Sequence, residues 1–205
     1  NNSRCHPNLQ ITSDGKVATH QGPKLWATVT TSKVFEPNTG VYEWVVRVDK
    51  CSKGHVFLGI LTADANTDRD SYVGVDRGGW GLIGTRSLWH NKSKVVADYG
   101  TGFGSGSVIN VRLNTNKGTL SFHTQDADWG VAFENIPKQA IFPAFSLHEK
   151  DDQISVLFCS KVEADTASDE IDKGTTSMAD VVGQDLRRTV EDFFISYNLN
   201  MFAFI

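Results

Sequence analysis

Apolar and polar residues alternate in short runs along most of the chain. The clearest run is residues 41–48 (VYEWVVRV), which places Tyr42, Trp44, Val46 and Val48 on one face and Glu43 and Arg47 on the other. In a strand, successive side chains point to opposite faces, so this pattern predicts a strand with one face in the core. Residues 56–61 (VFLGIL) are apolar on both faces, which predicts a central strand.

The run from Gly118 to Leu147 predicts a hairpin followed by a further strand. Residues 118–122 alternate, a polar turn follows, and residues 130–133 form the return strand. The next strand covers residues 141–145 and contains Pro143. Because proline has no N–H, this residue predicts a sheet edge, a bulge or a strand start.

Short strands separated by turn residues, with no helical periodicity, extend over residues 9–160. This pattern predicts an all-β protein, an antiparallel sandwich of two sheets. Residues 1–8 have no periodicity and are expected to be a lead-in. The first residue is not Met, so we expect a segment of a longer protein, with neighbouring domains in the same chain.

The composition changes after Cys159. Residues 161–176 are polar and acidic, which predicts a solvated linker. Residues 177–205 are predicted to form an amphipathic helix with an apolar end, which would dock on the sandwich or on the rest of a longer protein. The apolar positions recur at three- and four-residue spacing: Met178, Val182, Leu186, Val190, Phe193 and Tyr197.

Charge and cysteine content narrow the classes of function. The net charge of −4 argues against a nucleic-acid surface, which needs a basic patch. The three cysteines are odd in number and contain no C-x-x-C motif, so we expect neither disulfides nor a zinc clip, and a reduced, cytoplasmic location. No signal peptide and no apolar run of about 18 residues is present, so no membrane segment is expected.

No motif predicts catalysis, a cofactor or a metal. The glycines of residues 100–106 lack the P-loop order, and no G-x-S-x-G surrounds a serine. The histidines are scattered singly, without H-x-H or H-E-x-x-H spacing. The acidic residues of 64–76 lack the spacing of a calcium loop. We therefore expect no enzyme activity and no bound metal.

Several separated blocks resemble a known family. The later blocks look like the C-terminal half of a SPRY domain, the core of the B30.2 fold, and the earlier ones match its other signatures in order. The blocks are GVYEWVV (40–46), LGI (58–60), GWGL (79–82), GSVI (106–109), GTLSF (118–122), GVAFENIP (130–137) and FPAFSL (142–147). The resemblance implies a bent sandwich that acts as a non-catalytic protein-interaction module, as in many ubiquitin ligases and scaffolds.

The resemblance also suggests a binding residue. In the peptide-binding subfamily that serves ubiquitin ligases, a tyrosine on the loop before the Gly-Trp-Gly block contacts the ligand, and Asp70 to Gly74 (DSYVG) resembles that loop, which points to Tyr72. Leu147 and His148 stand where that subfamily has a Trp-Gly pair. Its preference for Asn-rich peptides is therefore not carried over.

Three loops are expected to cluster at one end of the sandwich, at residues 21–27, 63–72 and 147–152. Interface hot spots favour Trp, Tyr and Arg, so an aromatic side chain on such a loop is a candidate anchor for a partner. The predicted anchors are Trp26 and Tyr72. The full predicted set is Lys24, Leu25, Trp26, Arg69, Asp70, Tyr72, Leu147 and His148.

The leading hypothesis is a module that captures a peptide or loop of a protein partner, recruiting substrates for ubiquitination. Two alternatives remain. A lectin-like sandwich would stack sugars on Trp26, Trp89 or Trp129. A purely structural domain would instead pack permanently within a very large protein.

Overall fold

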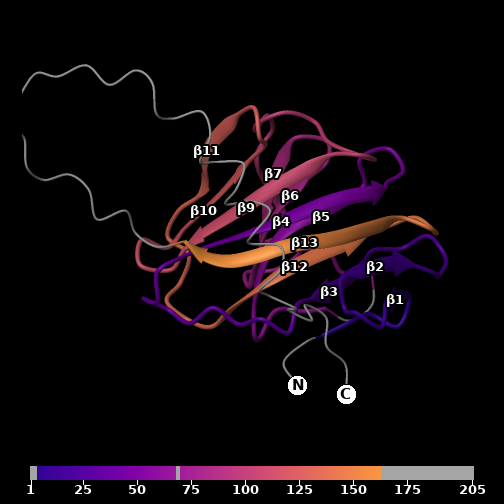
Figure 1. Ribbon diagram of the computed structural model, residues 1–205, viewed down its shortest axis with the longest axis horizontal. Helices are drawn as coiled ribbons and strands as arrows, with labels where there is room; N and C mark the ends of the chain where they lie inside the picture. Colours follow the sequence, from indigo (N-terminus) through magenta and orange to yellow (C-terminus); the bar gives the residue numbers. More distant parts are fainter. Residues whose placement is uncertain (1–3, 68–69, 163–205) are drawn as a thin grey trace, which may run out of the picture. The chain divides into compact units, whose positions relative to one another are not determined.

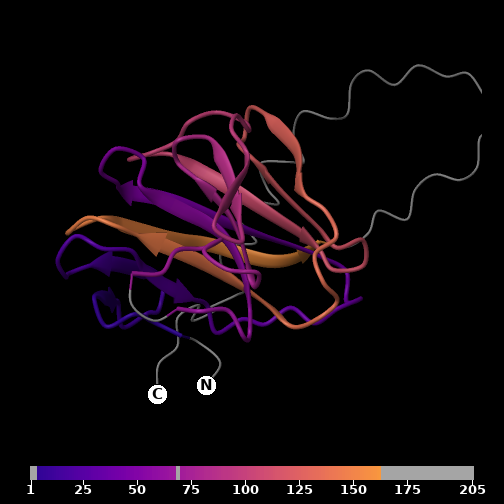
Figure 2. The same ribbon diagram turned by 180° about the vertical axis from the view of Figure 1, so that it is seen from behind.

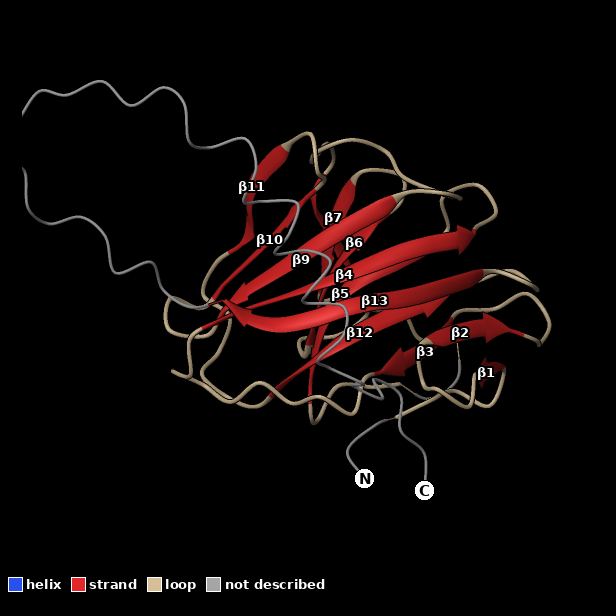
Figure 3. Ribbon diagram, viewed as in Figure 1, coloured by secondary structure: helices blue, strands red, loops and turns tan. Residues whose placement is uncertain are grey.

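The computed structural model describes residues 4–67 and 70–162, which form thirteen strands and no helix, so no described helix could cross a membrane (Figure 3). The predicted C-terminal helix and nearly all of the predicted linker lie outside the described residues. The strands are β1 (Leu9–Ile11), β2 (Val17–His20), β3 (Ala27–Thr30), β4 (Val41–Lys50), β5 (Val56–Thr62), β6 (Gly79–Ile83), β7 (Ser87–His90), β8 (Ser93–Val96), β9 (Val108–Asn114), β10 (Thr119–His123), β11 (Asp128–Phe133), β12 (Ile141–Leu147) and β13 (Gln153–Val162).

Two antiparallel sheets form the described part of the chain (Figures 1 and 2). The seven-stranded sheet has the order β1-β2-β13-β4-β9-β10-β11, and the six-stranded sheet has the order β3-β12-β5-β6-β7-β8. The all-β, two-sheet prediction is confirmed. β13 continues to Val162, two residues beyond the predicted end of the sandwich.

The strand β4 has one buried face and one polar face, which is the arrangement that alternating apolar and polar residues predict. Trp44, Val46 and Val48 are fully buried, as their alternate positions predict. On the opposite face, the Arg112 guanidinium of β9 donates to the Glu43 carboxylate at 2.8 Å. One face of this sheet therefore fills the core, and the other makes polar cross-strand pairs.

The central strands of the six-stranded sheet, β12, β5 and β6, are buried on both faces. In β5, Val56, Leu58 and Ile60 belong to the main core shared with the seven-stranded sheet. Phe57 and Leu61 point the other way and pack with Val73 and other residues in a second, smaller core. The segment between β5 and β6 covers this outer face, which explains a strand that is apolar throughout.

The position of Pro143 corrects a prediction. Its strand, β12, is hydrogen-bonded to β3 on one side and to β5 on the other, so β12 is not an edge strand. Pro143 is the third residue of β12 and so does not start the strand. The Pro143 carbonyl accepts a hydrogen bond from the Thr31 N–H at 3.0 Å, just beyond the end of β3. In an antiparallel pair, the N–H and the C=O of one residue point towards the same neighbouring strand. An N–H at position 143 would therefore point to the chain just beyond the end of β3, so its absence removes no hydrogen bond between β12 and β3.

Glycines in β6 let the preceding segment lie directly on the strand. A Cβ atom at Gly81 would be 2.4 Å from the Val73 carbonyl oxygen, and one at Gly79 would be 2.6 Å from the Gly74 nitrogen. Real Cβ atoms do not approach backbone so closely. The Gly-Trp-Gly block is therefore required by the close packing of residues 73 and 74 on β6.

The substitution Gly81→Ala tests this packing. The added methyl group must push the backbone at Val73 away from β6, so we expect a loss of about 1–3 kcal/mol in the free energy of unfolding, measured by urea denaturation. Gly104→Ala is the matched control, because a Cβ there meets nothing within 4 Å. Equal stability of the two variants would contradict the proposed role of Gly81.

Candidate functional site

The three loops predicted to form a binding face do meet in the structure. Trp26, from the loop before β3, has its ring centroid 5.7 Å from that of Tyr72 and 4.6 Å from that of His148. Tyr72 comes from the segment between β5 and β6, and His148 directly follows β12. Trp26, His55 and His148 lie close together because each adjoins one of the paired residues Ala27, Val56 and Leu147. The segment after β5 starts at the opposite end of these strands, at Thr62, and returns over the outer face of the sheet, where Tyr72 stacks on Phe57.

We call the group Trp26, His55, Phe57, Tyr72, Trp89 and His148 the aromatic cluster. Within it, the Tyr72 ring stacks on Phe57, with centroids 5.0 Å apart and planes at 16°. Trp89 meets the Tyr72 ring edge-on, with centroids 6.0 Å apart and planes at 89°. These contacts fix the tyrosine ring while leaving it half-exposed.

The Tyr72 hydroxyl can serve as a hydrogen-bond donor. Partial burial raises the pKa of Tyr72 above its ordinary value, because desolvation disfavours the phenolate. The group therefore stays protonated at physiological pH. A half-exposed ring with a donor at its tip combines apolar and polar recognition in one residue.

Buried hydroxyl groups hold the Tyr72 segment in place. The Ser146 Oγ accepts a hydrogen bond from the Val73 N–H at 2.9 Å and lies 2.8 Å from the Thr28 Oγ1. Thr28 in turn donates to the Ser71 carbonyl. Ser146 and Thr28 are fully buried, so both sides of Tyr72 are fixed by polar contacts that water cannot replace.

Asp70 and Lys24 have partners within the domain. The Asp70 carboxylate accepts a hydrogen bond from the Trp26 backbone N–H at 2.7 Å, which connects the two anchor loops. The Lys24 ammonium group lies 2.6 Å from the Glu149 carboxylate. This ion pair is exposed, so it contributes little stability and a partner can rearrange it.

The remaining predicted residues differ in accessibility. Leu25 is half-buried, and its N–H donates to the His148 carbonyl at 3.2 Å. The prediction for Leu147 needs correction, because its side chain is 0% exposed and packs in the core. It is the last residue of a strand that is buried throughout. Arg69 lies outside the described residues.

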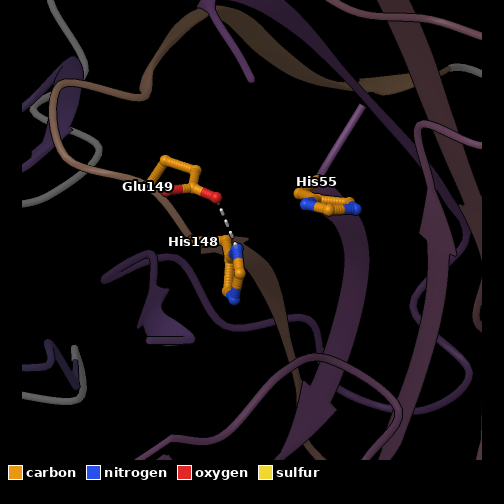
Figure 4. A group of neighbouring side chains, drawn as sticks. All are labelled: His55, His148 and Glu149. Carbon is orange, nitrogen blue, oxygen red and sulfur yellow. Dashed lines mark ion pairs between the residues drawn. The ribbon is translucent and has the colours of Figure 1, made fainter. Parts of the chain in front are cut away.

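The structure also brings together three residues that the sequence did not associate: His55, His148 and Glu149 (Figure 4). Leu147 pairs with Val56 across β12 and β5, so His148 and His55 each lie one residue beyond this pair. Their ring centroids are 5.2 Å apart. They are 93 positions apart in the sequence, and only the strand register could have revealed their proximity.

The environment of His148 favours its neutral form. Desolvation lowers the pKa of His148, and this effect outweighs the Glu149 carboxylate, which acts in the opposite direction. The His148 Nδ1 atom lies 3.5 Å from a Glu149 carboxylate oxygen. The residue therefore presents a neutral imidazole to its neighbours at physiological pH.

Asp152 connects the backbone segments that carry these residues. Its carboxylate is fully buried and accepts hydrogen bonds from the Ser52 N–H and the Glu149 N–H, both at 2.9 Å. Ser52 precedes His55 in the turn between β4 and β5. This carboxylate thus ties the turn after β12 to the turn before β5.

None of the cysteines offers a ready nucleophile. Cys5, Cys51 and Cys159 are free thiols, and burial raises the pKa of each to about 11. The thiolate is the reactive form, so all three are inert at physiological pH.

Residues 41–161 match the SPRY domain family. The chain belongs to the SPRY family. The match includes His55, Tyr72 and His148, whereas Lys24 and Trp26 precede it. SPRY domains are non-catalytic protein-interaction modules.

Curated relatives combine the SPRY domain with other domains. The "SPRY domain-containing SOCS box protein 3" of Xenopus laevis is 32% identical over 110 residues, which is 51% of this chain and 30% of the relative. The "F-box/SPRY domain-containing protein 1" of Drosophila persimilis is 25% identical over 168 residues, 78% of this chain and 65% of the relative. The chain thus spans less than two thirds of either relative.

Solved structures show the same fold. The SPRY domain of human HERC1 superimposes with a TM-score of 0.61 at 17% identity, covering 76% of this chain and 93% of that one. The TRIM65 PSpry domain gives a TM-score of 0.59 at 21% identity, covering 77% and 90%.

The variant Ser146→Ala tests the anchoring of the Tyr72 segment. It leaves the buried Val73 N–H without its acceptor and removes one of the two partners of the Thr28 hydroxyl, so we expect a loss of about 1–3 kcal/mol in the free energy of unfolding. Ser93→Ala in the exposed edge strand β8 is the control and should change stability by less than about 0.5 kcal/mol. Urea denaturation of both proteins provides the comparison. A loss at Ser146 no larger than at Ser93 would rule out this anchoring role.

Proposed function

We propose that this SPRY domain captures a protein partner, as an extended peptide or an exposed loop, on the surface formed by Lys24, Trp26, Asp70, Tyr72 and His148. One observation carries the proposal: the half-exposed Trp26 and Tyr72 rings, from separate loops, lie 5.7 Å apart and are held by contacts within the domain. Interface hot spots are enriched in such rigid aromatic side chains.

The fixed position of these rings favours binding. The loss of side-chain freedom on association costs about 0.5–1.5 kcal/mol for each mobile side chain that is immobilised. Tyr72 is already stacked on Phe57, and the Asp70 carboxylate already holds the Trp26 backbone. Binding therefore requires little further ordering, and an apolar side chain of the partner can pack on both rings.

The polar groups around the rings suggest the rest of the partner's chemistry. The Tyr72 hydroxyl can donate to a carbonyl of the bound segment. Lys24 and Asp70 carry opposite charges at the rim. Rim charges influence orientation and association rate more than affinity, so we expect the aromatic contacts to dominate the binding free energy.

The relatives support a proposal for the biological setting. One carries a SOCS box and another an F-box beside the SPRY domain. These combinations agree with a SPRY domain that serves as the substrate-receiving part of a ubiquitin ligase. We therefore propose that the partner is a substrate for ubiquitination and that the domain acts in the cytoplasm.

Binding measurements with single variants test the surface. Peptides selected from a displayed library against the 205-residue chain supply the ligand, and calorimetry supplies its affinity. Tyr72→Ala and Trp26→Ala should each weaken binding by about 10-fold or more, because each removes a hot-spot contact of at least about 1.4 kcal/mol. Val131→Ala, at a 53% exposed position on β11 of the other sheet, should leave the affinity unchanged.

Two results would contradict the proposal. One is a selected peptide whose affinity falls with Val131→Ala but not with Tyr72→Ala or Trp26→Ala. The other is saturable binding to glycans on an array that depends on Trp26 or Trp89, which would favour the lectin-like alternative. Thermal unfolding of each variant is the control that checks whether the fold is retained.

A further inference from the structure

The group His55, His148 and Glu149 offers the donors of a metal site. Each residue supplies one potential ligand atom, and these atoms all lie within 4.8 Å of one another. Figure 4 shows the Glu149 carboxylate pointing towards the His148 ring, with the His55 ring beside them. Two imidazoles and one carboxylate form a familiar protein ligand set for zinc.

The two imidazoles have unused coordinating atoms. The Nδ1 atoms of His55 and His148 are buried and make no hydrogen bond within the described residues, and the His148 Nδ1 atom faces a Glu149 carboxylate oxygen at 3.5 Å. Buried polar atoms are normally satisfied, so two such nitrogens beside a carboxylate need a physical explanation. A bound cation would satisfy both at once.

The backbone beneath these residues is fixed. His55 and His148 adjoin the paired residues Val56 and Leu147, which are fully buried in neighbouring strands. The buried Asp152 carboxylate accepts hydrogen bonds from the Glu149 N–H and the Ser52 N–H, and so fixes the turn after β12 relative to the turn before β5. The donors therefore project from the fixed ends of two central strands and do not depend on a mobile loop.

We propose that His55, His148 and Glu149 bind one Zn²⁺ ion, with a water molecule in the fourth position. Imidazole nitrogen favours zinc over calcium or magnesium, which prefer oxygen ligands. Tetrahedral zinc with bonds of about 2.1 Å places its ligand atoms about 3.4 Å apart. The donors must approach by about 1.4 Å from their largest separation, which side-chain rotation can provide.

Lys24 competes for the carboxylate. Its ammonium group lies 2.6 Å from the Glu149 Oε1 atom, and its side chain is 59% exposed. Zinc binding must therefore displace or share this ion pair. Removal of the lysine charge should strengthen zinc binding, an effect that a purely structural role for these residues would not produce.

Zinc binding can be measured on the chelator-treated 205-residue chain without any partner, so its outcome is independent of the peptide-binding proposal. We expect one equivalent of ZnCl₂ to bind in competition with a chromophoric chelator. His55→Gln, His148→Gln and Glu149→Gln should each weaken binding by about 10-fold or more. Lys24→Met should tighten binding several-fold.

Control variants distinguish this site from incidental zinc binding. His123→Gln removes a histidine of β10, on the other sheet, and should leave the affinity unchanged. X-ray absorption of the zinc-loaded protein should show two imidazole ligands. Zinc binding that survives the combined His55→Gln and His148→Gln change, or the absence of zinc binding by the folded wild-type chain, would overturn the proposal.

Discussion

The candidate binding surface depends on the close packing of residues 73 and 74 against β6. Without side chains at Gly79 and Gly81, backbone meets backbone there at distances that no Cβ atom would allow. The Ser146 hydroxyl also holds this segment, because it accepts a hydrogen bond from the Val73 N–H. The ring of the neighbouring Tyr72 stacks on Phe57, and this contact fixes its position at the surface.

This packing also explains why the central strands of the six-stranded sheet are buried on both faces. Its inner face shares a core with the seven-stranded sheet, and its outer face lies beneath the segment that carries Tyr72. Trp26 and Trp89 close the outer core at its margin, where they are half-exposed. The same aromatic side chains thus stabilise the fold and present the proposed binding surface.

Much of the fold could be predicted from the sequence, because a strand with one buried face imposes a period of two. The pattern in β4 placed Tyr42, Trp44, Val46 and Val48 on one face, and the last three are fully buried while Tyr42 is half-buried. Trp26 and Tyr72 were expected on loops that cluster at one end of the sandwich, and their ring centroids do lie close together, 5.7 Å apart. Their role in binding stays a prediction, as do the domain limits.

Other features depended on the strand register, which local patterns do not contain. Leu147 was expected at the surface, but it ends a strand paired on both sides and is fully buried. Pro143 was expected at an edge, start or bulge, but the end of β3 accommodates it. His55 and His148 come together only because Val56 pairs with Leu147. Non-local pairing thus determines what the sequence could not predict.

The indole N–H signals of the five tryptophans provide the most direct test of where a partner binds. Trp26 and Trp89 belong to the aromatic cluster, Trp44 and Trp80 are buried, and Trp129 lies on β11 of the other sheet. In an NMR titration with a selected peptide, the Trp26 and Trp89 signals should shift while that of Trp129 stays in place. A titration that moves the Trp129 signal and leaves Trp26 unchanged would contradict the central claim.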